Sequence, residues 1–180
     1  MEENELHDEI KRRFAIGDNP TKISLWKWSN DEYVGLELTG TETCPYCLTH
    51  PGLCNECPFV VYGLLHSTCM DLDNPFTSNL RSNNRTAWRK SVYNYIYDIG
   101  LVQAKKDVLE DFETVKTIYP QAIDPEQYPD AFRKILSNAI VSKLEYYGIT
   151  DYTFDFDDLP LDVSTEELIE YAFRRHRYEP

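Results

Sequence analysis

A chain of 180 residues with 42% hydrophobic residues and 24 aromatic side chains (3 Trp, 13 Tyr and 8 Phe) can bury a core, which argues against intrinsic disorder. Its 31 acidic and 18 basic residues give a net charge of −13, which disfavours nucleic acids and anionic membranes and favours a protein partner with a basic surface. The sequence shows no signal peptide and no long apolar run, so we expect a soluble protein of the cytoplasm.

The N-terminal part of the chain predicts one helix and one extended segment. Residues 3–16 have helical periodicity and Gly17 follows as a stop, and the apolar face consists of Leu6, Ile10 and Phe14. Residues 23–28 alternate between apolar and polar side chains, which predicts a strand or an extended edge. Residues 29–43 contain two glycines and are predicted as a loop.

Two longer helices are predicted in the second half of the chain. Apolar residues recur every three or four positions over residues 86–116, although Gly100 is expected to divide this stretch into two helices. The next helix, over residues 129–147, has the most regular apolar stripe, and Gly148 follows as a C-cap.

The C-terminal region predicts one more strand and one more helix. Residues 152–156 alternate in polarity and are expected to form a short strand. A final helix to about residue 177 is expected to begin at a capping box, the run Ser164, Thr165, Glu166 and Glu167.

These elements predict a mainly α fold with minor β, which places the chain in the α+β class. We expect one domain over residues 1–180, with a small zinc-binding knob at residues 44–69 and a helical part at residues 86–177.

All five cysteines lie within 26 residues, as two Cys-x-x-Cys pairs and a single residue: Cys44, Cys47, Cys54, Cys57 and Cys69. One such pair lets two thiolates bind a metal from a tight turn, and two pairs complete a tetrahedron. In a reducing compartment clustered cysteines are metal ligands more often than disulfides. The cluster therefore predicts a structural Zn²⁺ rather than five buried thiols.

Several ligand sets are compatible with this spacing. The plainest uses both Cys-x-x-Cys pairs, although the six residues between them form a short connection that depends on a reversal at Pro51-Gly52. An alternative set combines the first pair with Cys57 and Cys69. His50 and His66 are further candidates, because an imidazole can replace a thiolate on zinc.

Catalytic roles for the cysteines are disfavoured. Redox Cys-x-x-Cys motifs begin a helix after a strand, whereas this context is interpreted as loop broken by prolines. Four thiolates leave no open position for catalysis on zinc, and the one His-x-Glu of the chain, His7-Asp8-Glu9, is distant from the first cysteine pair. The chain also lacks a phosphate loop, Gly-x-Ser-x-Gly and His-Glu-x-x-His. We assign no catalytic residue. An enzyme with an unrecognised carboxylate site is a hypothesis that ranks below binding of a protein and binding of nucleic acid.

The order Cys-Pro-x-Cys, Cys-x-x-Cys-Pro and then Cys69 before Pro75-Phe76 resembles a loose group of small cysteine-rich bacteriophage-encoded proteins of unassigned function. The resemblance includes Trp26 and Trp28 before the cysteines and covers about residues 23–115. It implies a zinc knob and a phage origin, hence the cytoplasm of a host cell, but no activity.

Residues 151–170 contain eight acidic residues and no basic one. The plain interpretation is a solvated acidic surface. Calcium is disfavoured because Pro160 occupies the sixth position of the loop, where glycine is needed. A third interpretation is DNA mimicry, in which carboxylates occupy the basic groove of a nuclease or defence complex. The candidate partner-binding residues are Asp155, Asp157, Asp158 and Asp162.

The principal functional hypothesis is therefore a zinc-stabilised acidic protein-binding module, encoded by a phage to inhibit a host nuclease or defence complex. The alternative is a zinc-containing nucleic-acid-binding or regulatory protein. Its basis is a small basic and aromatic patch after the cysteines, made of Arg81, Arg85, Trp88, Arg89 and Lys90.

Overall fold

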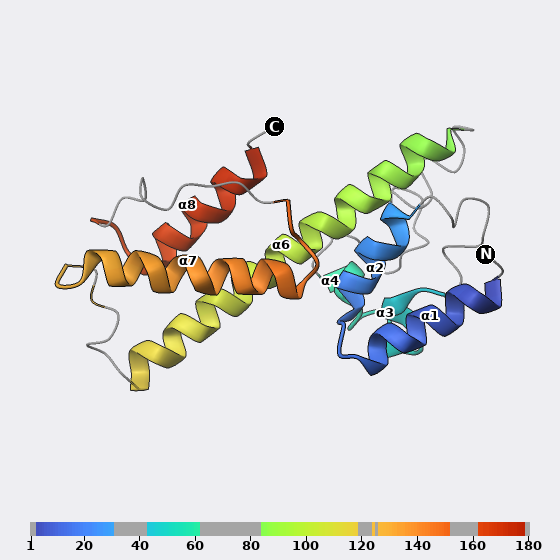
Figure 1. The fold of residues 1–180 in the computed structure, drawn as a ribbon, viewed down its shortest axis with the longest axis horizontal. Coiled ribbons are helices and arrows are strands. Elements are labelled where there is room, and N and C mark those ends of the chain that lie inside the picture. The colour runs from blue at the N-terminus through green and yellow to red at the C-terminus, as the bar shows by residue number, and fades with distance from the viewer. Residues whose placement is uncertain are drawn as a thin grey trace. The chain divides into compact units, whose positions relative to one another are not determined.

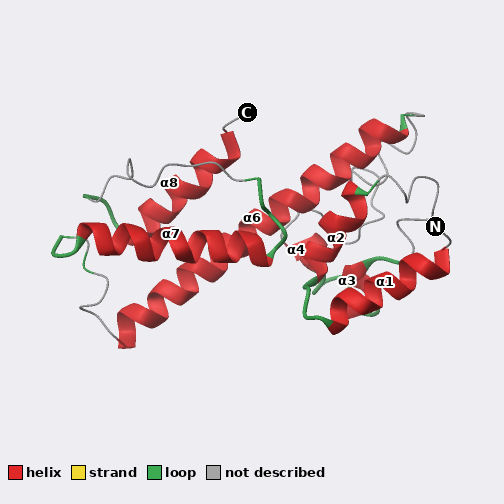
Figure 2. Cartoon of the chain, in the orientation of Figure 1, coloured by secondary structure: helices red, strands yellow, loops and turns green. Residues whose placement is uncertain are grey.

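The computed structural model describes residues 3–30, 43–61, 84–118, 124, 126–151 and 162–178, and within them the chain is mainly helical (Figure 1). These residues contain no strand (Figure 2). The predicted strand at 152–156 lies outside the described residues. The helices are α1 (Glu3–Ala15), α2 (Pro20–Ser29), α3 (Pro45–Thr49), α4 (Pro58–Val61), α6 (Arg85–Ile118), α7 (Pro129–Tyr146) and α8 (Thr165–Tyr178).

Residues 1–100 and 101–180 form two compact units, and α6 contributes to both. The first unit contains α1 to α4 and the beginning of α6, and the second contains the rest of α6 with α7 and α8. No helix in the described ranges has the length and hydropathy of a membrane span.

The first predicted helix is confirmed as α1. Leu6 and Ile10 are fully buried on its inner face, as the apolar periodicity indicates. The helix ends at Gly17, whose φ of 94° is in the left-handed region that glycine adopts without strain. The N–H groups of Gly17 and Asp18 donate to the carbonyls of Phe14 and Arg13, the two bonds of a Schellman motif.

The strand predicted at residues 23–28 is wrong, because these residues belong to the helix α2. Asn19 caps this helix, accepting a hydrogen bond of 3.0 Å from the N–H of Lys22, and Pro20 occupies the first helical position. The polar residues that gave the alternation are themselves buried, since Ser24 and Lys27 are as inaccessible as Ile23. A helix buried on most sides shows no amphipathic periodicity, so its pattern resembled a strand.

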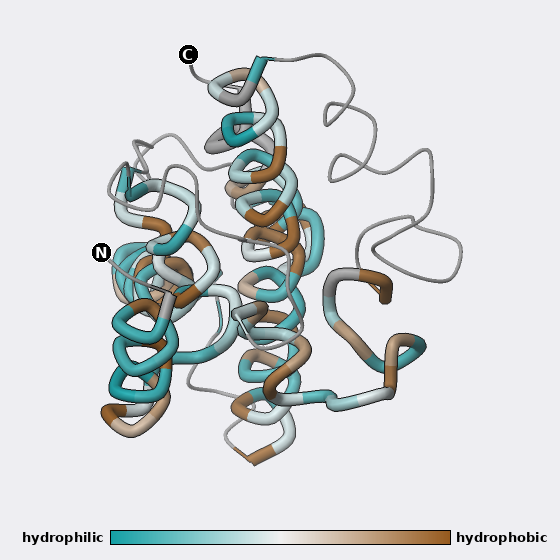
Figure 3. Tube along the Cα trace, turned by 90° about the vertical axis from the view of Figure 1, so that its right-hand side faces the viewer, coloured by the Kyte–Doolittle hydropathy of each residue, from teal (hydrophilic) through white to brown (hydrophobic). Residues whose placement is uncertain are grey.

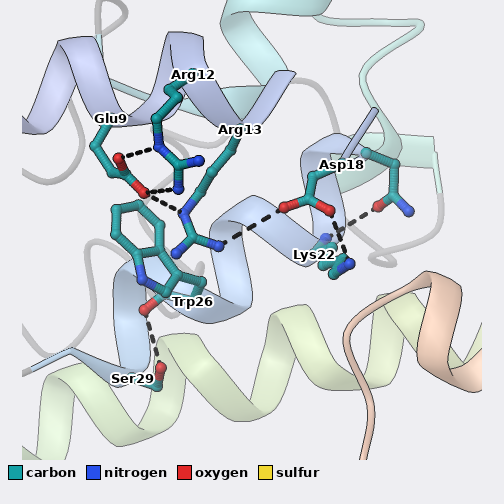
Figure 4. Close-up of polar contacts among 8 residues, drawn as sticks. Glu9, Arg12, Arg13, Asp18, Lys22, Trp26 and Ser29 are labelled. Carbon is teal, nitrogen blue, oxygen red and sulfur yellow. Dashed lines mark hydrogen bonds and ion pairs between the residues drawn. The ribbon is translucent and has the colours of Figure 1, made fainter. Parts of the chain in front are cut away.

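A network of charged side chains fixes the corner between α1 and α2 (Figure 4). The carboxylate of Glu9 accepts hydrogen bonds from Arg12 and Arg13, and the Arg13 guanidinium lies 3.8 Å from the centre of the Trp26 ring. Asp18 pairs with Arg13 and, at 2.7 Å, with Lys22. Arg13 therefore links α1 to α2 and to the corner, whereas the contact of Arg12 with Glu9 lies within α1.

The end of α2 is anchored to α6 by one aromatic pair and one arginine. The rings of Trp28 and Trp88 meet edge to face with centroids 5.1 Å apart. The Arg89 Nη2 donates to the carbonyl of Asn30 at 2.6 Å and to that of Trp28 at 3.3 Å. These carbonyls belong to the last turn of α2 and its C-cap, where a cation is favoured.

We expect Arg89→Met to lower the free energy of unfolding by about 2–3 kcal/mol, because two carbonyl groups lose a charged donor. Lys90→Met is the matched control, since Lys90 is the exposed neighbour on the same helix. Urea unfolding followed by tryptophan fluorescence measures both variants. Equal stability of the two variants would contradict this anchoring role.

The long helix α6 is continuous through Gly100, so the predicted division into two helices is wrong. Buried residues recur at helical spacing before this glycine (Val92, Ile96 and Ile99) and after it (Ala104, Val108 and Phe112). Because Gly100 is buried inside the helix, packing of its neighbours offsets its propensity cost of about 1 kcal/mol.

The second unit is built from helices with one apolar face each. The predicted stripe of α7 is largely confirmed, with Phe132, Leu136, Ile140 and Leu144 buried. Figure 3 shows hydrophobic and hydrophilic residues interspersed along the helical tubes. The Phe112 and Phe132 rings meet edge to face at 6.1 Å, and the Tyr147 hydroxyl donates to Asp107 at 2.8 Å.

Both predicted caps in the second unit are confirmed. Gly148 has a φ of 83°, and the N–H of Ile149 donates to the carbonyl of Leu144 in a second Schellman motif. At the start of α8 the Ser164 N–H and hydroxyl bind the carboxylate of Glu167, while the Glu167 N–H donates back to the Ser164 hydroxyl.

Candidate metal centre

A proline begins a short helix at each Cys-x-x-Cys pair. In the first pair the proline lies between the two cysteines, and in the second it follows the last cysteine. Cys44 is the extended N-cap residue of α3, and Pro45 is its first helical residue. Cys57 directly precedes Pro58, the first residue of α4. The interpretation of the first pair as loop broken by proline is therefore wrong, because proline at this position starts a helix.

The connection between the pairs is a sequence of tight turns. Gly52 has a φ of 74°, which confirms the chain reversal expected at Pro51-Gly52. The N–H of Leu53 donates to His50, and the N–H of Cys57 donates to the carbonyl of Cys54 at 3.3 Å. Six residues between the pairs are thus enough to bring the second pair back toward α3.

Tyr46, between the first two cysteines, fixes α3 against α2. Its side chain is almost completely buried, and its hydroxyl shares a hydrogen bond of 2.9 Å with the hydroxyl of Thr21. Burial raises the pKa of the Tyr46 phenol far above its usual value, so the group stays neutral. The first cysteine pair is therefore held in place by the core of the first unit.

A lysine is buried beside the first cysteine pair. Lys27 of α2 has no exposed surface, and its Nζ donates a hydrogen bond of 2.7 Å to the carbonyl of Thr43, the residue before Cys44. Burial lowers the pKa of Lys27 to about 8, while the charges of Cys44 and Cys47 oppose this decrease. The Lys27 side chain is thus placed beside the first cysteine pair, with which it interacts electrostatically.

The surroundings of Cys44 in the first pair also favour its thiolate form. A hydrogen bond from the Cys47 thiol lowers the pKa of Cys44 most strongly. Burial opposes this effect, whereas backbone N–H groups and the charge of Lys27 add to it. Because thiolates are the ligands that zinc binds, this environment prepares Cys44 for a metal.

A cavity of about 530 Å³ lies beside Cys47 of this pair and has soft metal ligands in its lining. Its lining includes thiols from both pairs and two imidazoles, together with apolar side chains. The thiols are those of Cys47, Cys54 and Cys57, and the imidazoles are those of His7 and His50. His7 comes from α1, three residues before the buried Ile10, and its sequence signal is the His-x-Glu run His7-Asp8-Glu9. Thiolate and imidazole suit zinc and other soft or borderline metals.

The structure brings only some of the predicted metal ligands close to one another. The four described cysteines are thiols, and Cys54 is the exposed one. Within the described ranges, no three His, Cys, Asp or Glu side chains are close enough together to hold a metal ion as they are placed. Cys69 and His66 lie outside those ranges, so the alternative set is not tested. The residues present nevertheless fit zinc by donor type, and Cys47, Cys54 and Cys57 line one cavity, although Cys44 is not among its lining residues.

The candidate partner-binding residues are almost all outside the described part of the chain. Asp155, Asp157 and Asp158 lie outside the described residues. Asp162 is described and is exposed just before α8.

Part of the basic and aromatic patch has structural contacts in the first unit. Trp88 packs on Trp28, and Arg89 donates to the end of α2. Lys90 is exposed, whereas Arg81 and the side chain of Arg85 lie outside the described residues. Two of the five residues of this patch therefore have structural roles.

No protein-family model, curated protein or solved structure matches this chain, so its function is argued from its own residues.

Proposed function

We propose that this protein is a zinc-stabilised acidic module that binds another protein. In this proposal Cys44, Cys47, Cys54 and Cys57 hold a structural Zn²⁺, which cross-links two turns of the first unit. The observation that carries the proposal is the gathering of thiols from both pairs at one cavity, with a buried lysine beside the first pair. A closed set of four thiolates has no position for a substrate, so the metal supports the fold.

A metal explains this arrangement better than a redox dithiol does. A redox motif needs one pair of cysteines, whereas here Cys47 of the first pair and both thiols of the second line the same cavity. Lys27 offsets negative charge at the first pair, which favours thiolates that stay charged. Zinc binds the thiolate form, so a ligand that is still a thiol releases its proton to solvent as the metal binds.

Protein binding is supported by the charge and surface of the second unit. Residues 101–180 contain 17 acidic and nine basic residues, a net charge of −8. Three of its tyrosines, Tyr128, Tyr146 and Tyr171, are substantially exposed. Tyrosine is enriched at protein interfaces, and a negative surface accelerates association with a basic partner.

The identity of the partner class follows from the acidic stretch at residues 151–170. A protein that normally binds nucleic acid offers the basic groove that such a stretch fits. Together with the resemblance to phage-encoded proteins, this suggests an inhibitor of a host nuclease or defence complex.

We expect the replacement of Asp155, Asp157, Asp158 and Asp162 by Asn to weaken partner binding by about tenfold, equivalent to about 1.4 kcal/mol. Purified protein is incubated with host extract, the captured partner is identified, and its affinity is then measured at two salt concentrations. The matched control removes four charges from α6 and α7, by changing Glu110, Asp111, Glu113 and Asp130 to their amides.

A larger effect of the aspartate set than of the control set supports a specific acidic surface. Equal effects would mean that net charge alone attracts the partner. Failure to capture any protein, or capture of nucleic acid alone, would contradict the proposed function and favour the regulatory alternative.

A further inference from the structure

We propose that Lys27 is a built-in counter-cation of the metal centre and raises its affinity for zinc. The inference depends on the proposed zinc ion and adds a residue that the cysteine pattern does not reveal. Lys27 would not be a ligand, since an ammonium has no lone pair to donate. Its role is to stabilise the thiolates of Cys44 and Cys47 by charge.

The position of the ammonium group is defined by packing. The Lys27 side chain is completely buried, and its Nζ lies 2.7 Å from the carbonyl oxygen of Thr43, which directly precedes Cys44. Its electrostatic partners include both thiols of the first pair. A lysine is almost never fully buried unless it is paired with opposite charge, and the first-pair thiols, once ionised, would supply that charge.

The helix α2, which carries Lys27, is held by contacts near its beginning and near its end. Thr21 of α2 shares a hydrogen bond with Tyr46, which stands between the two cysteines. Trp28, the residue after Lys27, packs on Trp88. The ammonium therefore has a fixed position relative to Cys44, as a residue that supports a metal centre requires.

The negative charge of the proposed zinc centre is the reason for a cation at this position. A zinc ion with four thiolates carries two net negative charges, and burying them next to the core is costly without a compensating cation. The protein as a whole carries a net charge of −13, so the long-range field of the chain opposes a further anionic centre. A cation buried at the first pair acts where screening by water and salt is weakest.

The test compares the zinc affinity of Lys27→Gln, Lys27→Met and the wild type by competition with a chromophoric chelator. Glutamine keeps a hydrogen-bond donor without the charge, and methionine has a similar volume without either property. Lys22→Gln is the control, because Lys22 lies on the same helix but pairs with Asp18 at the surface. We expect both Lys27 variants to bind zinc about 10- to 100-fold more weakly, and the control to bind like the wild type.

The melting temperatures of the metal-free and zinc-loaded forms separate charge from packing. A counter-cation predicts that the Lys27 variants lose part of the increase that zinc gives, while their metal-free forms remain stable. Wild-type affinity in both variants, or an equal loss of stability with and without zinc, would overturn the proposal. So would variants that do not fold even with zinc, since that result would assign Lys27 to packing alone. A wild-type chain that binds no zinc would instead overturn the metal centre itself.

Discussion

Removing zinc with a chelator is expected to lower the free energy of unfolding of the first unit by about 4 kcal/mol, when zinc was present at about a thousandfold above its Kd. The reason is that the ion binds the folded arrangement of two cysteine pairs, which the unfolded chain does not provide. All three tryptophans of the chain, Trp26, Trp28 and Trp88, lie in the first unit. Their fluorescence during urea unfolding therefore reports on the unit that contains the metal.

Single replacements of cysteine by serine determine the ligand set. Cys44→Ser should abolish the zinc-dependent increase in stability under either of the two sets predicted from the sequence. Cys54→Ser and Cys69→Ser separate these sets, because each residue belongs to only one of them. Since Cys54 lines the cavity with Cys47 and Cys57, we expect Cys54→Ser to lose the ion and Cys69→Ser to retain it.

An unchanged unfolding curve after chelation, with the metal shown to be absent, would contradict a stabilising role for zinc. Loss of zinc in Cys69→Ser with retention in Cys54→Ser would instead support the alternative set of Cys44, Cys47, Cys57 and Cys69.

The second large effect is expected from Phe132→Ala, which should destabilise the second unit by about 3–5 kcal/mol. Phe132 is 1% exposed, and its ring packs edge to face on Phe112. Removing it deletes apolar contact area and leaves a cavity between α6 and α7. Amide hydrogen exchange in α7, which has no tryptophan, measures this loss directly.

Ile135→Ala is the matched control for this replacement. Ile135 lies on the same helix but is 42% exposed, so its truncation should change the stability by about 0.5 kcal/mol or less. Zinc content should be unchanged in both variants, because the cysteines belong to the other unit. If tryptophan fluorescence showed the same destabilisation as hydrogen exchange in α7, the two units would unfold as one.

The helices that were predicted correctly are those with one buried face and a recognisable end. The stripe of α7 and the left-handed Gly148 can be read from the sequence because neighbours three and four residues apart share one face. The capping box at Ser164 is likewise a local pattern. Such features depend on interactions within a few residues.

The errors come from residues whose burial is decided by other parts of the chain. Ser24 and Lys27 are polar and look exposed in the sequence, so α2 resembled an alternating strand. The sequence signal that identifies this helix is Asn19-Pro20, a cap followed by a proline at the first helical position. At α6, packing on both sides of Gly100 overrides the low helix propensity of glycine.

The candidate site also combines features that a local sequence pattern predicts with features that depend on tertiary packing. The spacing of the cysteines predicts that two pairs approach each other, and thiols of both pairs do line one cavity. Lys27 and His7 lie 17 and 37 residues before Cys44, and only tertiary packing brings them to this cavity and its first cysteine pair. Lys27 carries no motif that would mark it, and His7 opens the run His7-Asp8-Glu9, which lies far from the cysteines in the sequence.

Native mass spectrometry of the chain purified under reducing conditions tests the central claim most directly. We predict one zinc ion per wild-type chain, its loss in Cys44→Ser and Cys54→Ser, and its retention in Cys69→Ser. A wild-type chain that is folded, reduced and free of metal after exposure to zinc would contradict the account.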